Sequence, residues 1–332
     1  MPVTGERMPG LTDGQGRTIS YLRLSLTDRC NLRCGYCAAH ADRPAAEPLR
    51  REEIRRLARI FARLGVRRVR LTGGEPTLRR DLLEIVADVG AIPGIEELAL
   101  TTNGFRLGEL AAPLRAAGVA RLNVSLDTLD GARLSRICGR PVRIERLLAG
   151  IEAATRAGFA SVKLNTVVMR GENDGEVGDI VRFAWGVGAL PRFIELMPFG
   201  GGVPVPAAET KRLLSRQGIA LRPDETRGWG PAYHMQGRDE AGGGDLTGLV
   251  GFISAMTENF CGSCNRVRVA ADGSLRACLG RHERLPLREL LATGLPDDEI
   301  GARILAELRR KGDRHRMERG GCALLPMVGT GG

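Results

Sequence analysis

The chain has 332 residues, a formal net charge of +10 and 43% apolar residues, which is enough to bury a sizeable core. No apolar run reaches the roughly 18 residues that span a bilayer, and the opening MPVTGERMPG lacks the apolar centre of a signal peptide, so we expect a cytoplasmic protein with no membrane partner. Acidic residues are interleaved with the basic ones and only 4% of the chain is aromatic, which argues against a nucleic-acid partner.

The first two thirds of the chain predict an α/β fold. Residues 1–17 are polar, rich in glycine and without periodicity, so we expect a flexible leader there. From residue 18 to 235, short runs rich in β-branched residues alternate with amphipathic stretches, as in parallel strands joined by helices. The six expected strands are 21–26, 66–72, 95–101, 119–126, 160–168 and 192–197, and the clearest helix is 51–64.

The last third has a different composition. Residues 236–248, QGRDEAGGGDLTG, predict a flexible loop, and short strands at 250–255 and 265–270 flank cysteines. Helices are expected near 287–294 and 298–310. We interpret residues 236–332 as a C-terminal α+β extension that closes a barrel formed by residues 18–235, and not as an independent domain.

Three cysteines follow the first expected strand in the run CNLRCGYC. Without an export signal, eight cysteines indicate metal binding more than disulfides. The spacing of Cys30, Cys34 and Cys37 suits a 4Fe-4S cluster, with one iron left open for the amino and carboxylate groups of S-adenosylmethionine. A zinc site, with His40 as a fourth ligand, is the alternative, but zinc sites usually have paired Cys-x2-Cys ligands.

A second triplet, Cys261, Cys264 and Cys278, lies in the extension. A Cys-x2-Cys pair alone favours zinc, whereas its position beside a first cluster motif and its missing fourth ligand favour a second 4Fe-4S cluster. Arg266 and Arg268 are two apart on the following strand, so they share a face, and guanidinium groups suit phosphate. Cys138 and Cys322 stand alone and are interpreted as small buried apolar residues.

Other candidate site residues lie on the strands or at their carboxyl ends. LTGGEP at 71–76 offers backbone to an amino group, or is simply a turn capped by Glu75. Charged side chains inside a barrel are costly unless paired, so the strand cations imply an anionic ligand or an internal acid such as Glu195. These cations are Arg23, Arg68, Arg70, Lys163 and Arg192.

Taken together, these motifs resemble the GTP 3',8-cyclase family of molybdenum cofactor biosynthesis (MoaA), within the radical S-adenosylmethionine superfamily. The resemblance runs from about Arg17 to Gly332 and includes LRLSLTDRCNLRCGYC, VRLTGGEPTLRRD, LTTNG, LNVSLDTLD, KLNTVVMRGEND, RFIELMPFG and FCGSCNRVRVAADGSLRACL. It implies a partial (β/α)6 TIM-like barrel of the radical S-adenosylmethionine type, with two 4Fe-4S clusters at opposite ends of one cavity.

The resemblance also assigns roles to single residues. Positions lining S-adenosylmethionine match Tyr36, Gly74, Ser125 and Met197. Positions holding GTP match Arg23, Arg68, Arg70, Thr101, Lys163, Arg192, Arg266 and Arg268. Arg266 and Arg268, with the terminal Gly331 and Gly332 that reach into the active site of the family, are the expected catalytic residues. The segment after Cys37 is several residues shorter than usual.

The implied reaction begins with a 5'-deoxyadenosyl radical that takes hydrogen from ribose carbon 3' of GTP, after which that carbon attacks guanine carbon 8. The implied partners are GTP, an electron donor such as flavodoxin or ferredoxin, the next enzyme of the molybdopterin pathway and a second copy of the chain in a homodimer. Two alternatives stay open at this point: a radical enzyme acting on a peptide, and a zinc-stabilised protein binding nucleic acid through its basic surface.

Overall fold

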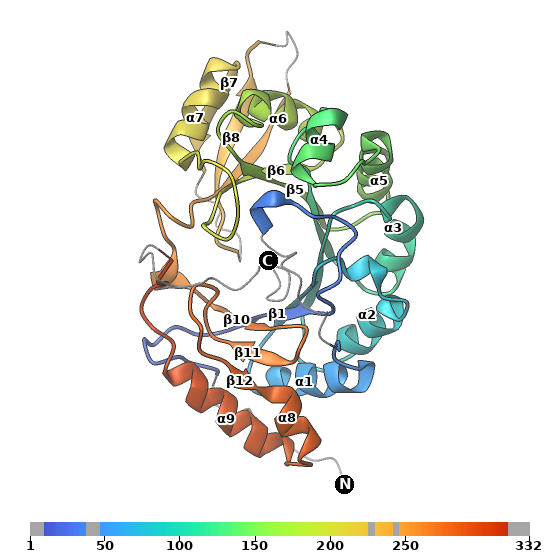
Figure 1. Cartoon of the computed structure of the whole chain (residues 1–332), viewed down its shortest axis with the longest axis vertical. Helices are drawn as coiled ribbons and strands as arrows, with labels where there is room; N and C mark the ends of the chain where they lie inside the picture. Colours follow the sequence, from blue (N-terminus) through green and yellow to red (C-terminus); the bar gives the residue numbers. More distant parts are fainter. Residues whose placement is uncertain (1–9, 38–46, 225–229, 242–245, 318–332) are drawn as a thin grey trace.

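A computed structural model of the chain describes residues 10–37, 47–224, 230–241 and 246–317. A curved sheet with the order β12-β11-β10-β1-β2-β3-β4-β5-β6-β9-β8-β7 surrounds a central space, and most of the helices lie on its outer side (Figure 1). The strands β10, β1 to β6 and β9 are neighbours in parallel pairs, so their carboxyl ends meet at one rim. The predicted partial barrel is therefore confirmed.

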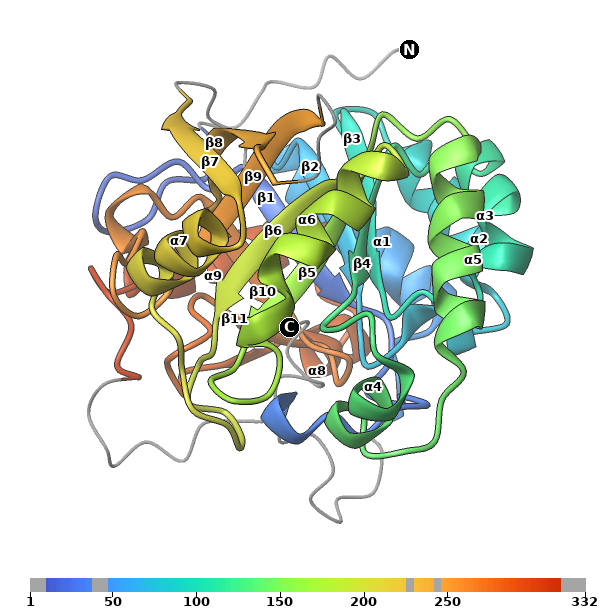
Figure 2. The same cartoon turned by 90° about the horizontal axis from the view of Figure 1, so that it is seen from above.

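The six predicted β-α units are present with small shifts at their ends. Their strands are β1 (Tyr21–Ser25), β2 (Arg68–Thr72), β3 (Glu97–Thr102), β4 (Arg121–Ser125), β5 (Ser161–Val168) and β6 (Leu190–Glu195). Their helices are α1 (Arg51–Arg63), α2 (Leu82–Gly90), α3 (Leu107–Ala116), α4 (Gly131–Ile137) with α5 (Ile144–Arg156), α6 (Val177–Gly186) and α7 (Ala207–Arg216). Both α4 and α5 follow β4, and α7 follows β6. Figure 2 shows α2, α3 and α5 side by side on the outer face.

The C-terminal third of the chain extends both edges of this sheet. The hairpin of β8 (Tyr233–Asp239) and β9 (Thr247–Ile253), with β7 (Ile219–Pro223) and α7 (Ala207–Arg216), continues the sheet beyond β6. At the other edge, β10 (Arg266–Val269) pairs with β1 and is followed by β11 (Ser274–Arg276) and β12 (Leu285–Pro286). Two helices, α8 (Leu287–Ala292) and α9 (Asp297–Arg309), complete this edge. The extension thus shares the barrel's sheet.

The strands alternate between an apolar outer face and a polar inner face. In β5 every second residue is buried, and Leu164 is fully buried against the helices while Lys163 and Asn165 are half-buried on the inner side. The same period places the cations of β1 and β2 on the inner side, because side chains two apart in a strand share a face. Burial of the outer-face Leu, Ile and Val against the helices therefore forces the charged residues into the central space.

Residues 10–17 contradict the prediction of a flexible leader throughout 1–17. Leu11 is fully buried and its amide donates to the carbonyl of Leu64 at 2.9 Å. The Asp13 carboxylate accepts from the Gln15 and Arg17 amides and forms an ion pair of 2.7 Å with the Arg17 guanidinium. The polar, glycine-rich composition of this segment suggested flexibility. The segment is instead a turn that is held by hydrogen bonds to the Asp13 side chain.

The prediction of a flexible loop over 236–248 is wrong at both of its ends. Gln236–Asp239 belong to β8 and Thr247 begins β9, and the two strands pair antiparallel. The glycines here mark a close approach and not mobility, because a Cβ on Gly237 or Gly248 would lie 2.7 or 2.6 Å from the Trp185 ring. The predicted boundary after residue 235 consequently falls inside a strand. In the described residues, no helix is long and apolar enough to cross a membrane.

Candidate active site

The first cysteine triplet lies on the segment that leaves β1. Cys30 and Cys34 precede a short 3-10 helix, Gly35–Cys37, in which the Cys37 amide donates to the Cys34 carbonyl at 3.0 Å. All three side chains line one cavity, together with Gly73, Gly74 and Ser125 from the ends of β2 and β4. The three thiols predicted to act together are therefore brought together.

The GGEP turn is fastened to the cysteine segment. The Gly74 amide donates to the Thr27 carbonyl at 2.7 Å and the Glu75 amide to the Arg29 carbonyl at 2.8 Å. A Cβ on Gly74 would lie 2.2 Å from the Arg29 oxygen, so only glycine permits this approach. These two amides are already hydrogen-bonded within the protein. An ammonium group bound at this turn would therefore be held by the carbonyl oxygens of the turn.

Glu75 links three of the loops at this rim. Its buried carboxylate accepts from the Thr77 amide at 3.0 Å, the Thr102 hydroxyl at 2.7 Å and the Asn103 amide at 2.7 Å. The Asn103 side chain in turn donates to Asn31, between the cysteines, at 2.8 Å. The predicted cap by Glu75 is confirmed, and the same carboxylate fixes the LTTNG loop against the cysteine segment.

The surroundings of this triplet disfavour thiolate in the metal-free protein. Burial raises the pKa of the Cys30 thiol to about 11, with a smaller contribution from the Glu75 carboxylate. The pKa of Cys34 is raised by its hydrogen bond with Cys138, by burial and by Asp127. Cys138 is 3% exposed and packs in the apolar core, as predicted, directly against a candidate ligand.

Tyr36 and Asp127 connect the cysteine helix to the far side of the cavity. The Tyr36 hydroxyl donates to the Asp127 carboxylate at 2.8 Å, and the Val167 amide donates to its other oxygen at 2.9 Å. Burial raises the pKa of Asp127 to about 6. Of the residues expected beside S-adenosylmethionine, Gly74 and Ser125 line the first triplet's cavity, Met197 lines the adjoining one, and Tyr36 lines both.

The second triplet is built on the β9–β10 connection and the segment after β11. Cys261, Cys264 and Cys278 line the adjoining cavity, which encloses about 1390 Å³, part of it open to solvent. Burial raises the pKa of Cys264, but the charges of Arg266 and Lys311 outweigh it, and the pKa falls to about 7. This thiol is therefore partly ionised at neutral pH, unlike those of Cys30 and Cys34, whereas burial raises the pKa of Cys278.

Cations from three adjacent strands form a row on the inner face. Arg23 of β1 is in register with Arg268 of β10 and with Arg70 of β2, and all three line the cavity of the second triplet. Burial and the neighbouring Arg268 and Arg70 lower the pKa of Arg23 well below its usual range. Burial, followed by Arg266, likewise lowers the pKa of Arg268 to about 10. Crowded cations of this kind gain stability when an anion binds among them.

Arg192 of β6 lines the cavity of the second triplet, whereas Lys163 of β5 lines neither cavity. Arg192, 4% exposed, donates from Nε and Nη2 to Asn165 at 3.0 and 2.6 Å, and burial together with Arg70 lowers its pKa to about 9. Burial, then the charges of Arg192 and Arg70, lower the pKa of Lys163 to about 7. Lys163 shares the inner face of β5 with Asn165 but lies towards the amino end of the strand.

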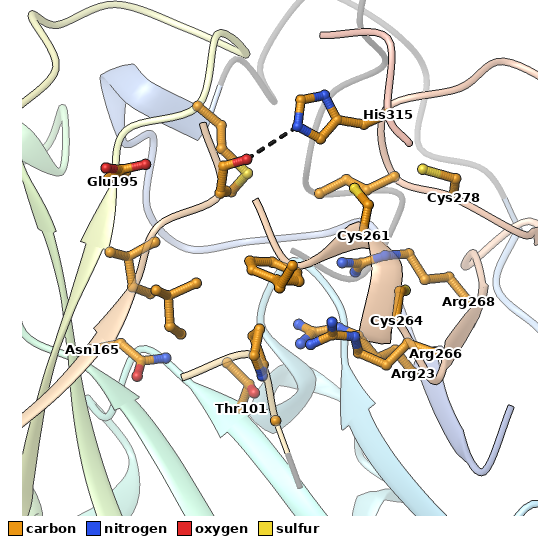
Figure 3. Close-up of a pocket in the computed structure, with 18 of the residues that line it drawn as sticks. Arg23, Thr101, Asn165, Glu195, Cys261, Cys264, Arg266, Arg268, Cys278 and His315 are labelled. Carbon is orange, nitrogen blue, oxygen red and sulfur yellow. Dashed lines mark hydrogen bonds between the residues drawn. The ribbon is translucent and has the colours of Figure 1, made fainter. Parts of the chain in front are cut away.

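Two expectations about the cations need revision. Arg68 does not line either cavity and faces Glu97, with its Nη1 3.9 Å from the carboxylate. Glu195 is not the internal acid partner, because its carboxylate accepts from the amides of Ala207 at 3.0 Å, Met256 at 2.9 Å and Thr257 at 3.0 Å. Figure 3 shows Glu195 well apart from the cluster of Arg23, Arg266 and Arg268. Glu195 instead holds the loop that leads to Cys261.

The two cavities adjoin along the centre of the barrel. Tyr36, Thr101, Asn165 and Val167 line both of them, so the two triplets face the same interior from its two ends. In Figure 3, Thr101 and Asn165 lie on one side of this space, and Cys261, Cys264 and Arg266 on the other.

Several residues of this interior escaped the sequence analysis. Asn165 and Tyr21 both line it. Their signal was present, because Asn165 and Tyr21 are each two residues from a predicted cation and therefore on its face. His40, Cys322, Gly331 and Gly332 lie outside the described residues.

Comparisons with known proteins agree over most of the chain. Residues 24–184 match the radical SAM superfamily, and residues 191–317 match Molybdenum Cofactor Synthesis C. GTP 3',8-cyclase 2 of Pseudomonas aeruginosa is 43% identical over 317 residues, covering 93% of this chain and 94% of that protein. The chain belongs to the GTP 3',8-cyclase family.

Two further likenesses accompany this membership. Molybdenum cofactor biosynthesis protein 1 of Drosophila melanogaster is 42% identical over 320 residues, covering 92% of this chain and 54% of that protein. The crystal structure of Streptococcus suis SuiB bound to precursor peptide SuiA has a TM-score of 0.63 at 15% identity, covering 95% of this chain and 71% of that one. At that identity the likeness shows the fold alone, which is the radical SAM fold.

The superfamily implies a 4Fe-4S cluster and S-adenosylmethionine, and the first triplet fits them. Three thiols line one cavity beside a glycine turn that a Cβ would obstruct. Within the described residues, no three His, Cys, Asp or Glu side chains are placed to hold a single metal ion. The Cys-x3-Cys-x2-Cys spacing in the sequence suits a cluster, in which each thiolate binds a different iron.

Proposed function

We propose that the protein converts GTP to (8S)-3',8-cyclo-7,8-dihydroguanosine 5'-triphosphate, the first step of molybdenum cofactor biosynthesis. The observation that carries the proposal is the row Arg268–Arg23–Arg70, which faces a cavity between two cysteine triplets. A nucleoside triphosphate has the charge that such a row requires, and it is long enough to place its base and its phosphates on different walls.

The residues divide the work between the two ends of the cavity. When bound at Cys30, Cys34 and Cys37, the cluster with S-adenosylmethionine supplies a 5'-deoxyadenosyl radical able to take hydrogen from ribose carbon 3'. Gly74, Ser125, Met197 and Tyr36 would hold that cofactor, since they line the adjoining cavities at this end. Thr101 is shared by both cavities and would face the ribose.

The triphosphate would lie against the cation row and Arg192. These guanidinium groups are half-buried or buried, so phosphate contacts there are poorly screened by water. Lys163 would contribute towards the amino ends of the strands, and Arg68 would act through Glu97 and not by direct contact. Fixing the phosphates fixes the ribose at the first triplet, and closing the cavity over it keeps water from a reactive intermediate.

The second triplet would hold a second 4Fe-4S cluster with an open iron that binds the purine. Its support is the group of three thiols in the same cavity as the arginines, with Cys264 partly ionised at neutral pH. Arg266, stacked 4.8 Å from the Phe260 ring centre, borders this end and would orient the base together with Arg268. Gly331 and Gly332 would complete the site.

The same proposal includes three partners. They are an electron donor such as flavodoxin or ferredoxin, a second copy of the chain and the next enzyme of the pathway.

The experiment is an anaerobic incubation of the reconstituted, reduced protein with S-adenosylmethionine and GTP. We expect about eight irons per chain, and formation of 5'-deoxyadenosine together with a cyclised nucleotide. ATP in place of GTP is the matched control, and it should give no cyclised product. If 5'-deoxyadenosine formed equally well without GTP, the protein would still be a radical enzyme, but GTP would not be its substrate.

A further inference from the structure

A buried lysine, Lys311, lies beside the second cysteine triplet, and the proposed function gives it no role. It follows the end of α9, and its side chain is 4% exposed. Its Nζ donates to the carbonyl of Arg266 at 2.7 Å and lies 3.4 Å from the Cys264 sulfur, within hydrogen-bonding distance.

The position of Lys311 is fixed by the segment that carries it. The Arg17 guanidinium donates to the Gly312 carbonyl at 2.8 Å, the Asp313 carbonyl at 3.1 Å and the Cys261 carbonyl at 2.7 Å. Arg17 is held in turn by its ion pair with the buried Asp13. A single guanidinium thus ties the backbone after Lys311 to the backbone of the cysteine loop, and Lys311 has little freedom to point elsewhere.

The charge of a buried ammonium group requires a counter-charge nearby. The hydrogen bonds of Lys311 go to a carbonyl oxygen and to a sulfur, and its ammonium group is nearly inaccessible to water. A thiolate at Cys264, the form that ligates metal, is the anion in direct contact with the lysine.

We infer that Lys311 donates a hydrogen bond to the Cys264 thiolate when this residue ligates the second cluster, and that it raises the reduction potential of that cluster. Reduction adds one negative charge to the cluster. A hydrogen bond to a ligand sulfur and a nearby positive charge both stabilise the reduced form more than the oxidised form. The inference rests on the proposed second cluster.

The first triplet supplies the contrast. The Asp127 side chain lines the cavity of Cys30, Cys34 and Cys37, and a carboxylate there opposes reduction. Lys311 therefore makes the second cluster the more easily reduced of the two, and it leaves the first cluster as the stronger reductant for S-adenosylmethionine.

The test measures the midpoint potential of the second cluster alone. In the full chain carrying Cys30→Ala, Cys34→Ala and Cys37→Ala, only the second triplet can assemble a cluster, and an anaerobic redox titration followed by electron paramagnetic resonance gives its potential. In this background we expect Lys311→Met to reduce the equilibrium constant for reduction about tenfold, a shift of about 59 mV to more negative potential for a one-electron couple.

Three further variants separate an effect on the potential from an effect on folding. Lys311→Arg keeps the charge and the donors and should recover most of the shift. Arg310→Met changes the neighbouring residue, whose side chain is 82% exposed, and should leave the potential unchanged. If Lys311→Met loses iron, Lys311→Gln, which keeps a donor without the charge, should still show a smaller negative shift.

The outcomes distinguish this inference from the proposal on which it rests. Four irons per chain with the same potential in Lys311→Met and its parent would overturn the role of Lys311 and leave the second cluster standing. A parent protein that assembles no cluster would overturn the second cluster and the role of Lys311 with it.

Discussion

The two cysteine triplets line adjoining cavities, and the thiols of Cys30 and Cys34 have different charged neighbours from the thiol of Cys264. Cys30 and Cys34 are buried near the carboxylates of Glu75 and Asp127, and their pKa values are raised. Cys264 is buried beside Arg266 and Lys311, and its pKa is lowered to about 7. In the proposed function, the first end would hold a strongly reducing centre that acts on a cationic sulfonium, and the second would hold a centre beside an anionic nucleotide. The same ligand type would then serve two tasks through its neighbours.

Removing one triplet at a time should have the largest effect, and the two variants should lose different products. Replacing Cys30, Cys34 and Cys37 by Ala should reduce both 5'-deoxyadenosine and cyclised nucleotide to background, because no radical is generated. Replacing Cys261, Cys264 and Cys278 by Ala should abolish the cyclised nucleotide and leave slow, GTP-independent formation of deoxyadenosine. Chromatography of both products checks this, and equal losses of deoxyadenosine in the two variants would contradict a division of work.

Arg192→Met should weaken GTP binding without affecting S-adenosylmethionine. Loss of a charge-assisted contact costs about 1.5–3 kcal/mol, or about 10- to 100-fold in the dissociation constant. Equilibrium dialysis with each ligand measures the two affinities, and Arg192→Lys should fall between wild type and Met. If the affinity for S-adenosylmethionine fell by as much, Arg192 would belong to the general structure of the cavity.

Lys163 should make GTP binding depend on pH. Its pKa of about 7 in the free protein should rise when triphosphate binds, so that binding takes up a proton. The affinity for GTP should therefore fall as pH rises above 7, by at most about tenfold per pH unit. The affinity of wild type for GTP also changes with pH because the phosphates of GTP titrate. Lys163→Arg, which stays charged, should keep that part of the pH dependence and lose the part that comes from Lys163. Superimposable profiles would exclude Lys163 from the phosphate site.

Tyr36→Phe should have the smallest effect, and it should change the affinity for S-adenosylmethionine alone. The change removes the hydrogen bond to Asp127 and keeps the ring. We expect a cost of about 1 kcal/mol, or about fivefold weaker binding of S-adenosylmethionine, with unchanged affinity for GTP. Titration calorimetry of the two ligands would show the asymmetry, and a larger loss for GTP would contradict it.

The sequence predicted the strands and both triplets because these features have a short period or a fixed spacing. Arg266 and Arg268 were placed on one face by the two-residue repeat of a strand, and both line the cavity. What escaped prediction depends on contacts between distant segments. Gly237 and Gly248 suggested mobility until Trp185 was seen to occupy the space beside them. Glu195, placed among the cations by composition, is bound by amides that come from two other loops.

Lys311 shows the same limit most clearly. Forty-seven residues separate it from Cys264, and nothing in RRKGDRHRM distinguishes it from its neighbours. The contact exists because Arg17, in a segment predicted to be flexible, joins the end of α9 to the cysteine loop. A charged residue becomes part of a site here through burial, and burial is set by the assembled fold.

The most direct test of two centres with separate tasks is a reciprocal ligand titration of the two triple-alanine variants, followed by electron paramagnetic resonance. The variant that keeps only Cys30, Cys34 and Cys37 should show a spectrum changed by S-adenosylmethionine and not by GTP. The variant that keeps only Cys261, Cys264 and Cys278 should show a spectrum changed by GTP and not by S-adenosylmethionine. If GTP altered the first spectrum, or if the second variant held no cluster, the division of the cavity into two ends would be wrong.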